Sequence, residues 1–427
     1  MRATSSGNLG SGCAASKRAG QATGNAAIGW PPATVWVPAC AASAYLWLVF
    51  ATTVPFPGAI GLNYNTLGTD WMVFDGAIGA VLAGDATLIY DGDRFTDLLD
   101  KRFAAWLSQP LPFRPWTYPP SFLLLLAPFA GLGFPASYVA FQLVTAALMI
   151  AALRLIARDG DACRLLMTMA LACPAAAINV IDGQVAFLVI ALTVGGIAWL
   201  DARPVAAGLI LGLLTFKPQF CILVPLALIA AGAWRALAAA ALSAVTLAVA
   251  SAWTFGWQLW ADWLPLIVGH LLNPDAKWIA YGRMWGHSVH TCAVLLGAPA
   301  GLATAVQLLA ACGSAAAVVA AFRSPLRAGG RTGVLLAAMV LAAPHSGPYD
   351  AIALTVAAGL WLADRAAPPL WCWTLAFLVW LVPLLSPPLL VAAGRLSPLL
   401  VAVLITCLLR SGAARPPMSR PLPAMVG

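Results

Sequence analysis

Residues 206–237, AAGLILGLLTFKPQFCILVPLALIAAGAWRAL, form two apolar runs on either side of a single Lys-Pro pair. Apolar runs of roughly 15 to 24 residues recur along the rest of the chain, and short polar or Pro/Gly breaks separate them. A helix of that length crosses a hydrocarbon layer about 30 Å thick. The sequence therefore predicts an all-α polytopic membrane protein.

The composition excludes a soluble globular protein. Of the 427 residues, 62% are hydrophobic and 9% are charged, whereas about a quarter of a soluble domain is charged. The net charge of +8 does not indicate nucleic-acid binding, because in a membrane protein the side of the bilayer that carries Lys and Arg matters more. The nine cysteines occur singly and without a CxxC pair, which indicates packed free thiols.

The placement of arginine predicts the topology. The composition of residues 1–30 predicts a disordered cytoplasmic leader. We expect a single transmembrane domain over 31–410, which includes a first outer loop at 55–134. A cytoplasmic tail is expected at 411–427. If the short, Pro-interrupted segment 119–132 re-enters from the outside, the inter-span arginines fall in the cytoplasm. They are Arg154, Arg158, Arg164, Arg203, Arg235, Arg323, Arg327, Arg331, Arg365 and Arg410. We expect about twelve spans with both termini inside.

The first outer loop carries two apolar stripes at helical spacing. The first consists of Trp71, Phe74, Ile78, Val81 and Leu82, with Gly84 as a stop signal. The second consists of Phe95, Leu98, Leu99, Phe103 and Trp106. Both stripes predict amphipathic helices that lie in the membrane interface instead of crossing it.

Asp70 lies at the start of the first of these helices and is the candidate catalytic residue. Because Asp is a preferred N-cap residue, Asp70 could simply cap a helix that begins at Trp71. Alternatively, burial against Trp71 and Phe74 would raise the basicity of an outward-facing carboxylate and suit it to take a proton from a hydroxyl. The local sequence leaves both interpretations open.

Further polar residues fall on the same predicted outer face. Lys217 lies between two apolar runs, where a lysine costs about 2.5 to 3.5 kcal/mol unless it reaches the interface or finds a counter-ion such as phosphate. The turn that contains His345, Tyr349 and Asp350 is either an interfacial turn with a capping Asp or part of a site. Gln184 lies in a similar outer turn, and Arg283 could contact a phosphate.

Several common catalytic motifs are missing from the sequence. His287 and His290 form HxxH without a nearby carboxylate or cysteine at ligand spacing, so no metal site is predicted. No P-loop, no GxGxxG that opens a helix and no GxSxG elbow occurs. We expect neither a metal nor another cofactor.

Five stretches, in this order, resemble glycosyltransferase family 87, the polyprenyl-phosphate-mannose-dependent α-mannosyltransferase-like proteins of the GT-C class. They are TDWMVFDGAIGAVLAGDATLIYD (69–91), WTYPPSFLLLLAPF (116–129), DGQVAFLVIAL (182–192), the stretch quoted first (206–237) and APHSGPYDAIAL (343–354). The chain departs from the family in its long leader and in having Trp71 where Phe is common.

The resemblance implies a GT-C fold and a specific reaction. An inverting glycosyltransferase would move a hexose, with mannose expected, from a polyprenyl phosphate to a hydroxyl of a glycolipid or glycan. The site would face the periplasm from a bacterial inner membrane, in contact with membrane lipid. Asp70 would be the general base. The expected donor and phosphate contacts are Lys217, His345, Arg283 and Gln184, and the expected positioning residues are Tyr118, Tyr349 and Asp350.

Two other classes of function fit the same composition. A transporter or lipid flippase would also carry charges within the membrane, where they mark a substrate path. It predicts polar residues near mid-span and movement of a tracer without a covalent product. A non-catalytic envelope scaffold predicts that replacement of Asp70 or Lys217 has no effect on any reaction.

Overall fold

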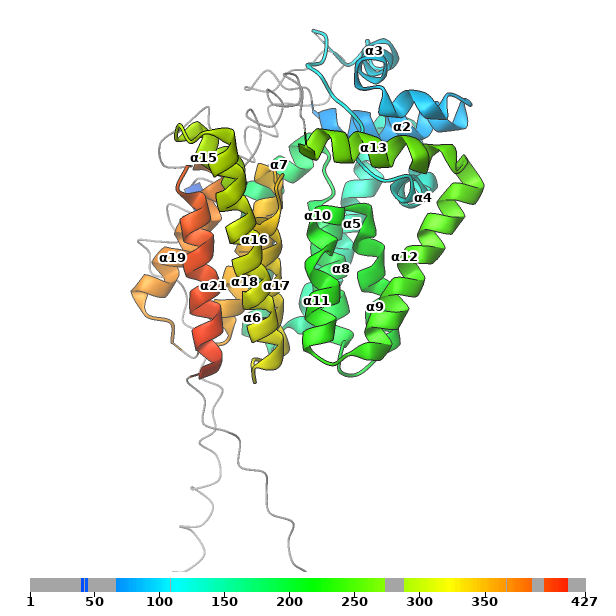
Figure 1. Ribbon diagram of the computed structural model, residues 1–427. Helices are drawn as coiled ribbons and strands as arrows, with labels where there is room; N and C mark the ends of the chain where they lie inside the picture. The colour runs from blue at the N-terminus through cyan, green and yellow to red at the C-terminus, as the bar shows by residue number, and fades with distance from the viewer. Residues whose placement is uncertain are drawn as a thin grey trace, which may run out of the picture.

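The computed structural model describes residues 40–41, 43–44, 67–107, 109–272, 288–365, 367–385 and 395–413. In these ranges every regular element is a helix, as the sequence predicts. Most helices run along one direction and form a bundle (Figure 1). Its three longest are α5 (Phe134–Ile156), α12 (Trp234–Phe255) and α16 (Ala300–Arg323).

Shorter helices complete the bundle. They are α6 (Gly160–Ala172), α7 (Pro174–Asp182), α8 (Ala186–Trp199), α9 (Pro204–Gly212), η3 (Leu213–Phe216), α10 (Pro218–Cys221), α11 (Leu223–Ala230), α15 (Val289–Leu295), α17 (Ala328–Ala342), η4 (Pro348–Ala351), α18 (Ile352–Ala363), α19 (Leu370–Leu381), η5 (Val382–Leu385) and α21 (Ser397–Ala413). The centre of the bundle is formed by α17 and α18, and all 12 residues of α18 are buried.

The apolar helices identify a membrane protein. By length and composition, α5, α12 and α16 can each cross a bilayer, and the pair α6–α7, bent by 50°, is a fourth candidate. Seven further stretches of 10–17 residues are apolar but shorter. The expected total of about twelve spans stays a prediction.

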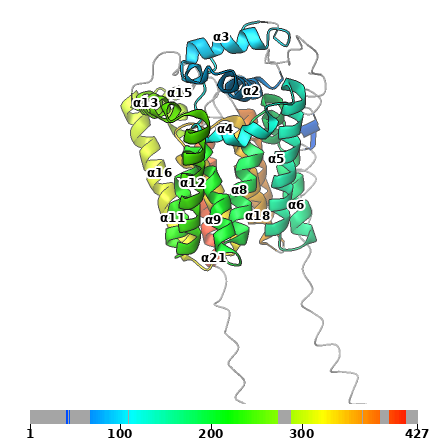
Figure 2. The same ribbon diagram turned by 90° about the vertical axis from the view of Figure 1, so that its right-hand side faces the viewer.

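A layer of helices lies across one end of the bundle (Figures 1 and 2). We call it the cap layer. It consists of α2 (Thr69–Leu82), α3 (Gly92–Arg102), α4 (Ser121–Leu126) and α13 (Gln258–Leu272), with the short turn η1 (Ala86–Tyr90) between α2 and α3. Helix α4 has six residues and so rises only about 9 Å, which is too short for this helix to cross a bilayer; that segment 119–132 re-enters from the outside stays a prediction.

The sequence prediction is wrong about the surroundings of α2. Every residue from Thr69 to Ile78 is buried, including the two carboxylates Asp70 and Asp75, whereas Leu82 of the predicted apolar stripe is exposed. Protein covers the first ten residues of α2 on all sides, and α3 forms part of this cover: a Cβ on Gly76 would come within 2.3 Å of Leu99 Cδ2. The apolar face of α3, with Phe95 and Leu99 buried, therefore packs on protein, where the prediction placed lipid.

The opposite end of the bundle is basic. Arg154 lies in the last turn of α5, Arg235 in the first turn of α12, Arg323 at the end of α16 and Arg410 in the last turn of α21. Figures 1 and 2 place these helix ends together, away from the cap layer. We call this the basic end.

Helix α12 carries exposed tryptophans toward both ends. Trp234 is 63% exposed near the basic end and Trp253 is 90% exposed near the cap layer, about 28 Å further along the helix. Tryptophan is enriched at both membrane interfaces, which are separated by a hydrocarbon core about 30 Å thick. The distance between the two tryptophans therefore fits a bilayer whose plane is perpendicular to the axis of the bundle, with the cap layer at one surface of the membrane.

Several expectations fall on residues outside the described ranges. These are the leader 1–30, most of the first apolar run at 33–54, Arg283, His287 and residues 414–427 of the tail. Of the first run, residues 40, 41, 43 and 44 are described and helical, and the Ser43 hydroxyl donates to the carbonyl of Ala172.

Candidate active site

Asp70 does not cap its helix. Helix α2 begins at Thr69, its N-cap is Gly68 with a left-handed φ of 72°, and no side chain caps it. The Asp70 carboxylate instead accepts a hydrogen bond at Oδ2 from Gln184 Nε2 at 2.8 Å. Its Oδ1 lies 3.5 Å from Arg114 Nη1, and its side chain is 12% exposed. The structure thus excludes the N-cap interpretation and leaves this carboxylate directed at side chains from distant parts of the chain.

Gln184 is held in one orientation by its neighbours. Its Oε1 accepts from the backbone N–H of Val185 at 3.0 Å and from the Tyr118 hydroxyl at 3.3 Å. Because a backbone N–H can only donate, Oε1 must face Val185, and Nε2 is then the group that faces Asp70. The Gln184 backbone carbonyl accepts from Gln142 Nε2 at 3.0 Å.

Helix α7 delivers Gln184 to Asp70 through a glycine turn. Gly183 follows the last residue of α7 in the left-handed conformation, with φ of 77°, a position that favours glycine. A Cβ at Gly183 would lie 2.6 Å from Trp71 Cβ and 3.1 Å from Trp71 N. The Gly68 N–H donates to the Ile181 carbonyl at 2.7 Å. The start of α2 and the end of α7 are therefore locked together at the backbone.

Arg114 is a site residue that the sequence analysis did not select. It lies in the extended segment 109–118, and its side chain is 6% exposed. Its backbone N–H donates to Thr96 Oγ1 of α3 at 3.0 Å, and the Leu111 N–H donates to Asp100 Oδ1 of α3 at 2.8 Å. One feature of the sequence could have identified Arg114: it is a positive charge between two aromatic residues, in the stretch FRPW (113–116), on a loop predicted to face outside.

A second carboxylate lies beside this pair. Asp182, the last residue of α7, is half-buried and lies two residues before Gln184, which donates to Asp70. Asp75, by contrast, pairs with Arg102 of α3 at 3.0 Å, so the two acidic residues of α2 have separate partners.

Hydrogen bonds at the backbone hold Tyr118 in place, in addition to the bond that its hydroxyl donates. Its carbonyl accepts from the Tyr90 hydroxyl at 3.1 Å, and the preceding carbonyl of Thr117 accepts from Trp263 Nε1 of α13 at 3.1 Å. Burial raises the pKa of Tyr90 above its usual range, so Tyr90 remains a neutral donor. The Tyr118 ring packs against Phe122 with a centroid distance of 4.7 Å.

Lys217 and Asp350 form a second buried cluster. Lys217 Nζ lies 2.5 Å from Asp350 Oδ1, and Asp350 Oδ2 accepts from the Gly347 N–H at 2.9 Å. The Lys217 amine also lies 4.6 Å from the ring centroid of Phe220 and 5.4 Å from that of Tyr349. The counter-ion of Lys217 in this structure is therefore a carboxylate of the chain itself, and Asp350 is both an ion-pair partner and a cap.

Helix α7 joins the two clusters. It contacts α2, which carries Asp70, and η4, which carries Tyr349 and Asp350. Phe122 also stacks on Phe216 with centroids 4.9 Å apart, which connects Tyr118 to the residue before Lys217. His345 is half-buried in the turn that leads into η4. The structure thus brings together Asp70, Gln184 and Tyr118, and pairs Lys217 with Asp350 beside Tyr349.

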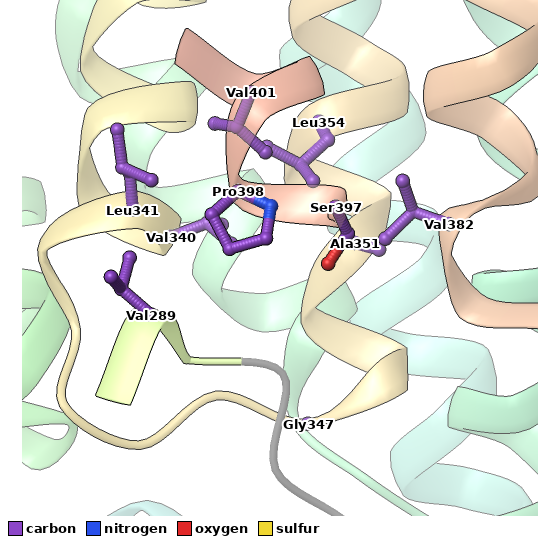
Figure 3. A pocket seen from close by; sticks show the side chains of 10 residues that line it. All are labelled: Val289, Val340, Leu341, Gly347, Ala351, Leu354, Val382, Ser397, Pro398 and Val401. Atoms are coloured by element: carbon purple, nitrogen blue, oxygen red, sulfur yellow. The ribbon is translucent and has the colours of Figure 1, made fainter. Parts of the chain in front are cut away.

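An apolar pocket lies behind the His345–Asp350 turn. Figure 3 shows its lining, in which the Ser397 hydroxyl is the one polar side-chain group. The lining residues are Val289, Val340, Leu341, Gly347, Ala351, Leu354, Val382, Ser397, Pro398 and Val401. The cavity holds about 20 Å³, room for about one water molecule. As enclosed by the described residues, it is too small for a sugar and is not the substrate site.

The site has the composition of an acid-base centre. Within the described ranges, no group of three or more His, Cys, Asp or Glu side chains could hold a metal ion. What the geometry offers is a nearly buried carboxylate with fixed hydrogen-bond partners, which can accept a proton from a substrate hydroxyl.

Comparison with known families shows the class of reaction. The sequence profile of glycosyltransferase family 87 matches residues 116–344, more than half of the chain. The match includes Tyr118, Gln184 and Lys217, whereas Asp70, Arg114 and the His345–Asp350 turn fall outside it. Neither a curated protein nor a solved structure matches the chain. The extent of the profile match shows that the chain belongs to glycosyltransferase family 87.

Proposed function

We propose that this membrane glycosyltransferase moves a hexose, mannose, from a polyprenyl-phosphate donor to a hydroxyl of a glycolipid or glycan. The reaction takes place at the cap layer, on the periplasmic side of a bacterial inner membrane. Asp70 is the general base, and the anomeric carbon is inverted. The proposal combines the family membership with the geometry around Asp70.

The observation that carries the proposal is the placement of the Asp70 carboxylate. It lies at the start of a buried helix, yet it makes no cap, and it is 12% exposed between Arg114 and Gln184. A carboxylate in such a position has a partly desolvated oxygen and a fixed direction, which are what a general base needs. A purely structural carboxylate at this place would serve the backbone N–H groups of α2.

The proposed step is balanced without a cofactor. The acceptor oxygen attacks the anomeric carbon and forms the new C–O bond while the bond from that carbon to the phosphate oxygen breaks. The acceptor proton moves to Asp70, and the bonding electrons leave with polyprenyl phosphate. Because phosphate is a weak base, its departure needs charge stabilisation more than protonation. Gln184 and Tyr118 keep Asp70 aligned with the acceptor.

Lys217, His345 and Arg283 are the proposed phosphate contacts. Lys217 is paired with Asp350 at 2.5 Å, so a bound phosphate would share its charge or replace Asp350 as its partner. Tyr349 and Asp350 then position the Lys217 amine. Cationic groups aimed at a leaving phosphate stabilise the charge that develops in the transition state.

The basic end supports the proposed orientation. Arginines flanking membrane spans favour the cytoplasmic side, and in this fold they lie at helix ends opposite the cap layer. With the basic end in the cytoplasm, Asp70 faces the periplasm, where a lipid-linked sugar donor is used and nucleotide sugars are not available.

Replacement of Asp70 by Asn tests the proposal directly. Asp70→Asn keeps the shape and the bond from Gln184 but cannot take a proton, so transfer from radiolabelled polyprenyl-phosphate mannose to a membrane lipid extract should fall by about 10²- to 10⁴-fold. Asp75→Asn is the matched control, because Asp75 lies in the same helix and pairs with Arg102. It should keep transfer close to the wild-type rate.

Two results would contradict the proposal. Near-normal transfer by Asp70→Asn would exclude Asp70 as the base. Movement of labelled lipid across proteoliposomes without any covalent product would identify a transporter or flippase instead.

A further inference from the structure

We infer that Gln142 and Asn179 are positioning residues for transfer, because they fix the turn that presents the Gln184 amide to Asp70. The inference rests on the proposed role of Asp70 as the base. It adds two buried residues that lie apart from the sugar and the phosphate and act through Gln184.

The turn from Gly183 to Ala186 is built on Asn179. The Asn179 carbonyl accepts from the Gly183 N–H at 3.0 Å and from the Gln184 N–H at 2.9 Å. Its side-chain Oδ1 accepts from the Ala186 N–H at 2.9 Å, where α8 begins. The Val185 N–H donates to the Gln184 side chain itself. Every N–H of this turn therefore ends on Asn179 or on Gln184.

Gln142 of α5 holds the same turn through its carbonyl. The Gln142 Nε2 donates to the Gln184 carbonyl at 3.0 Å, and the Gln142 Oε1 accepts from Asn179 Nδ2 at 3.0 Å. Asn179 is fully buried and Gln142 is 6% exposed, so little water competes for these bonds. Two amides that bond to each other thus clamp the turn between α5 and α7.

Backbone groups at both ends fix the direction of every bond in this chain of amides. The Ala186 N–H can only donate, so Asn179 Oδ1 faces it and Asn179 Nδ2 faces Gln142. The Gln184 carbonyl can only accept, so Gln142 Nε2 faces it and Gln142 Oε1 faces Asn179. The two assignments, made from opposite ends, agree at the bond between the amides. They hold the Gln184 backbone in one arrangement, from which its side chain reaches Asp70 at 2.8 Å.

Stability alone does not require amides at these positions. A buried amide is costly unless its groups are paired, and apolar side chains of the same shape can replace a buried hydrogen-bonded pair at little cost. What a hydrogen bond adds to an apolar contact is a preferred direction. Because a displacement of about 1 Å at a catalytic group can cost about 10²-fold in rate, a turn without this clamp would misplace Gln184 and, with it, Asp70.

Gln142→Met tests the inference through the separate effects on kcat and KM. The variant keeps the length of the side chain and loses both hydrogen bonds, so kcat per folded molecule should fall by about 10- to 10²-fold. The KM for radiolabelled polyprenyl-phosphate mannose should change little, because the proposed phosphate contacts lie in the cluster of Lys217. In a Gln184→Met background, Gln142→Met should lower kcat no further, since the amide that it positions is already gone.

Gln142→Asn is a second variant for the case in which Gln142→Met does not fold. It keeps an amide in the core, but its shorter side chain cannot reach both the Gln184 carbonyl and Asn179. The same fall in kcat, with little change in the KM for the donor, is expected.

Gln307→Met is the matched control. Gln307 of α16 is 6% exposed, as Gln142 is. Its amide also bonds to backbone groups, namely the N–H of His290 and the carbonyls of Leu341 and Ala342. Because none of these groups belongs to the turn at Gln184, the variant should lose stability in thermal unfolding and keep its kcat per folded molecule.

The outcomes separate this inference from the proposed function. If Asp70→Asn abolishes transfer while Gln142→Met and Gln142→Asn keep the wild-type kcat, the inference is wrong and the base stands. The inference is also wrong if Gln142→Met lowers kcat equally with and without Gln184→Met, or if Gln307→Met lowers kcat to the same extent. If Asp70→Asn remains active, the base assignment itself is wrong.

Discussion

At the scale of single residues, the Lys217–Asp350 pair offers a way to distinguish a structural role of Lys217 from a role in substrate binding. Both side chains are buried, and removal of one member of such a pair leaves an uncompensated charge that costs about 3–5 kcal/mol. Removal of both charges with side chains of similar shape costs far less. A double-variant cycle can therefore ask whether Lys217 has any role beyond balancing Asp350.

We expect Lys217→Met to be strongly destabilised and the double variant Lys217→Met with Asp350→Asn to recover most of the loss. Asn keeps an oxygen for the Gly347 N–H, which donates to Asp350 in the wild type. Thermal unfolding in detergent measures the stability. Because we propose that Lys217 contacts the donor phosphate, the double variant should still show a raised KM for the donor. Full recovery of transfer would reduce Lys217 to a structural role.

The sequence could mark Lys217 as a residue in need of a partner, but it could not name that partner. Asp350 lies 133 positions further along the chain, and the chain has 15 acidic residues from which to choose. The same limit hid Arg114, whose pairing with Asp70 depends on how α3 supports segment 109–118. Residue types suggested the chemistry, whereas the pairing came from the fold.

At the scale of elements, the junction of α2 and α7 determines the geometry around Asp70, the proposed base. Gly183 turns the chain so that Gln184 faces Asp70, and it does so against the backbone of Trp71. A side chain at this position would have to adopt a left-handed conformation and would also push the two helices apart. The junction is thus sensitive to a single methyl group.

Gly183→Ala should lower both stability and transfer. The left-handed backbone alone costs about 1–2 kcal/mol for a residue with a Cβ, and the contact at 2.6 Å with Trp71 Cβ adds to it. Because a displacement of about 1 Å at a catalytic group can cost about 10²-fold in rate, transfer per folded molecule should fall by that order.

The matched control is Gly232→Ala. Gly232 has φ of 65°, but a Cβ added there would meet no other atom within 4 Å, and the residue lies in the turn between α11 and α12. The variant should bear the backbone cost without the clash and keep its transfer rate per folded molecule. Equal rates for the two variants would argue that the junction does not position Gln184.

The sequence predicted the helices of the first outer loop better than their surroundings. The stripe from Phe95 to Phe103 corresponds to a real buried face of α3. For α2, the pattern suggested one apolar face, yet protein surrounds the helix. In a chain that is 62% hydrophobic, apolar periodicity tells which residues avoid water, but lipid and protein satisfy that requirement equally well.

At the scale of the whole molecule, the two ends of the bundle have different chemistry. One end collects arginines at helix termini, and the other carries the cap layer with the candidate site. The arginine positions in the sequence predicted this division, because short loops between successive spans must alternate between the two ends. The total number of spans did not follow as firmly, since many of the helices are shorter than a bilayer requires.

Cysteine labelling tests the orientation. In a cysteine-free background, Asp85→Cys, at the exposed end of α2, should react with a membrane-impermeant maleimide in intact cells, because the proposed orientation places the cap layer outside. Asp201→Cys, an exposed aspartate in the turn between α8 and α9, should react only after lysis. The two variants replace the same residue type, so the reverse pattern would invert the topology.

The bond from Gln184 to Asp70 also bears on what the enzyme does when no acceptor is present. Water is the smallest alternative nucleophile, and a freely hydrated base would let it destroy a costly lipid-linked donor. Here one oxygen of Asp70 already holds an amide donor and the other faces a guanidinium. Because an ionised carboxylate can accept about four hydrogen bonds, a hydroxyl can still reach Asp70 while Gln184 stays in place. Under the proposed function, the lone pairs of Asp70 that remain are few and fixed in direction, so a hydroxyl held in place by the site is favoured over a freely moving water molecule.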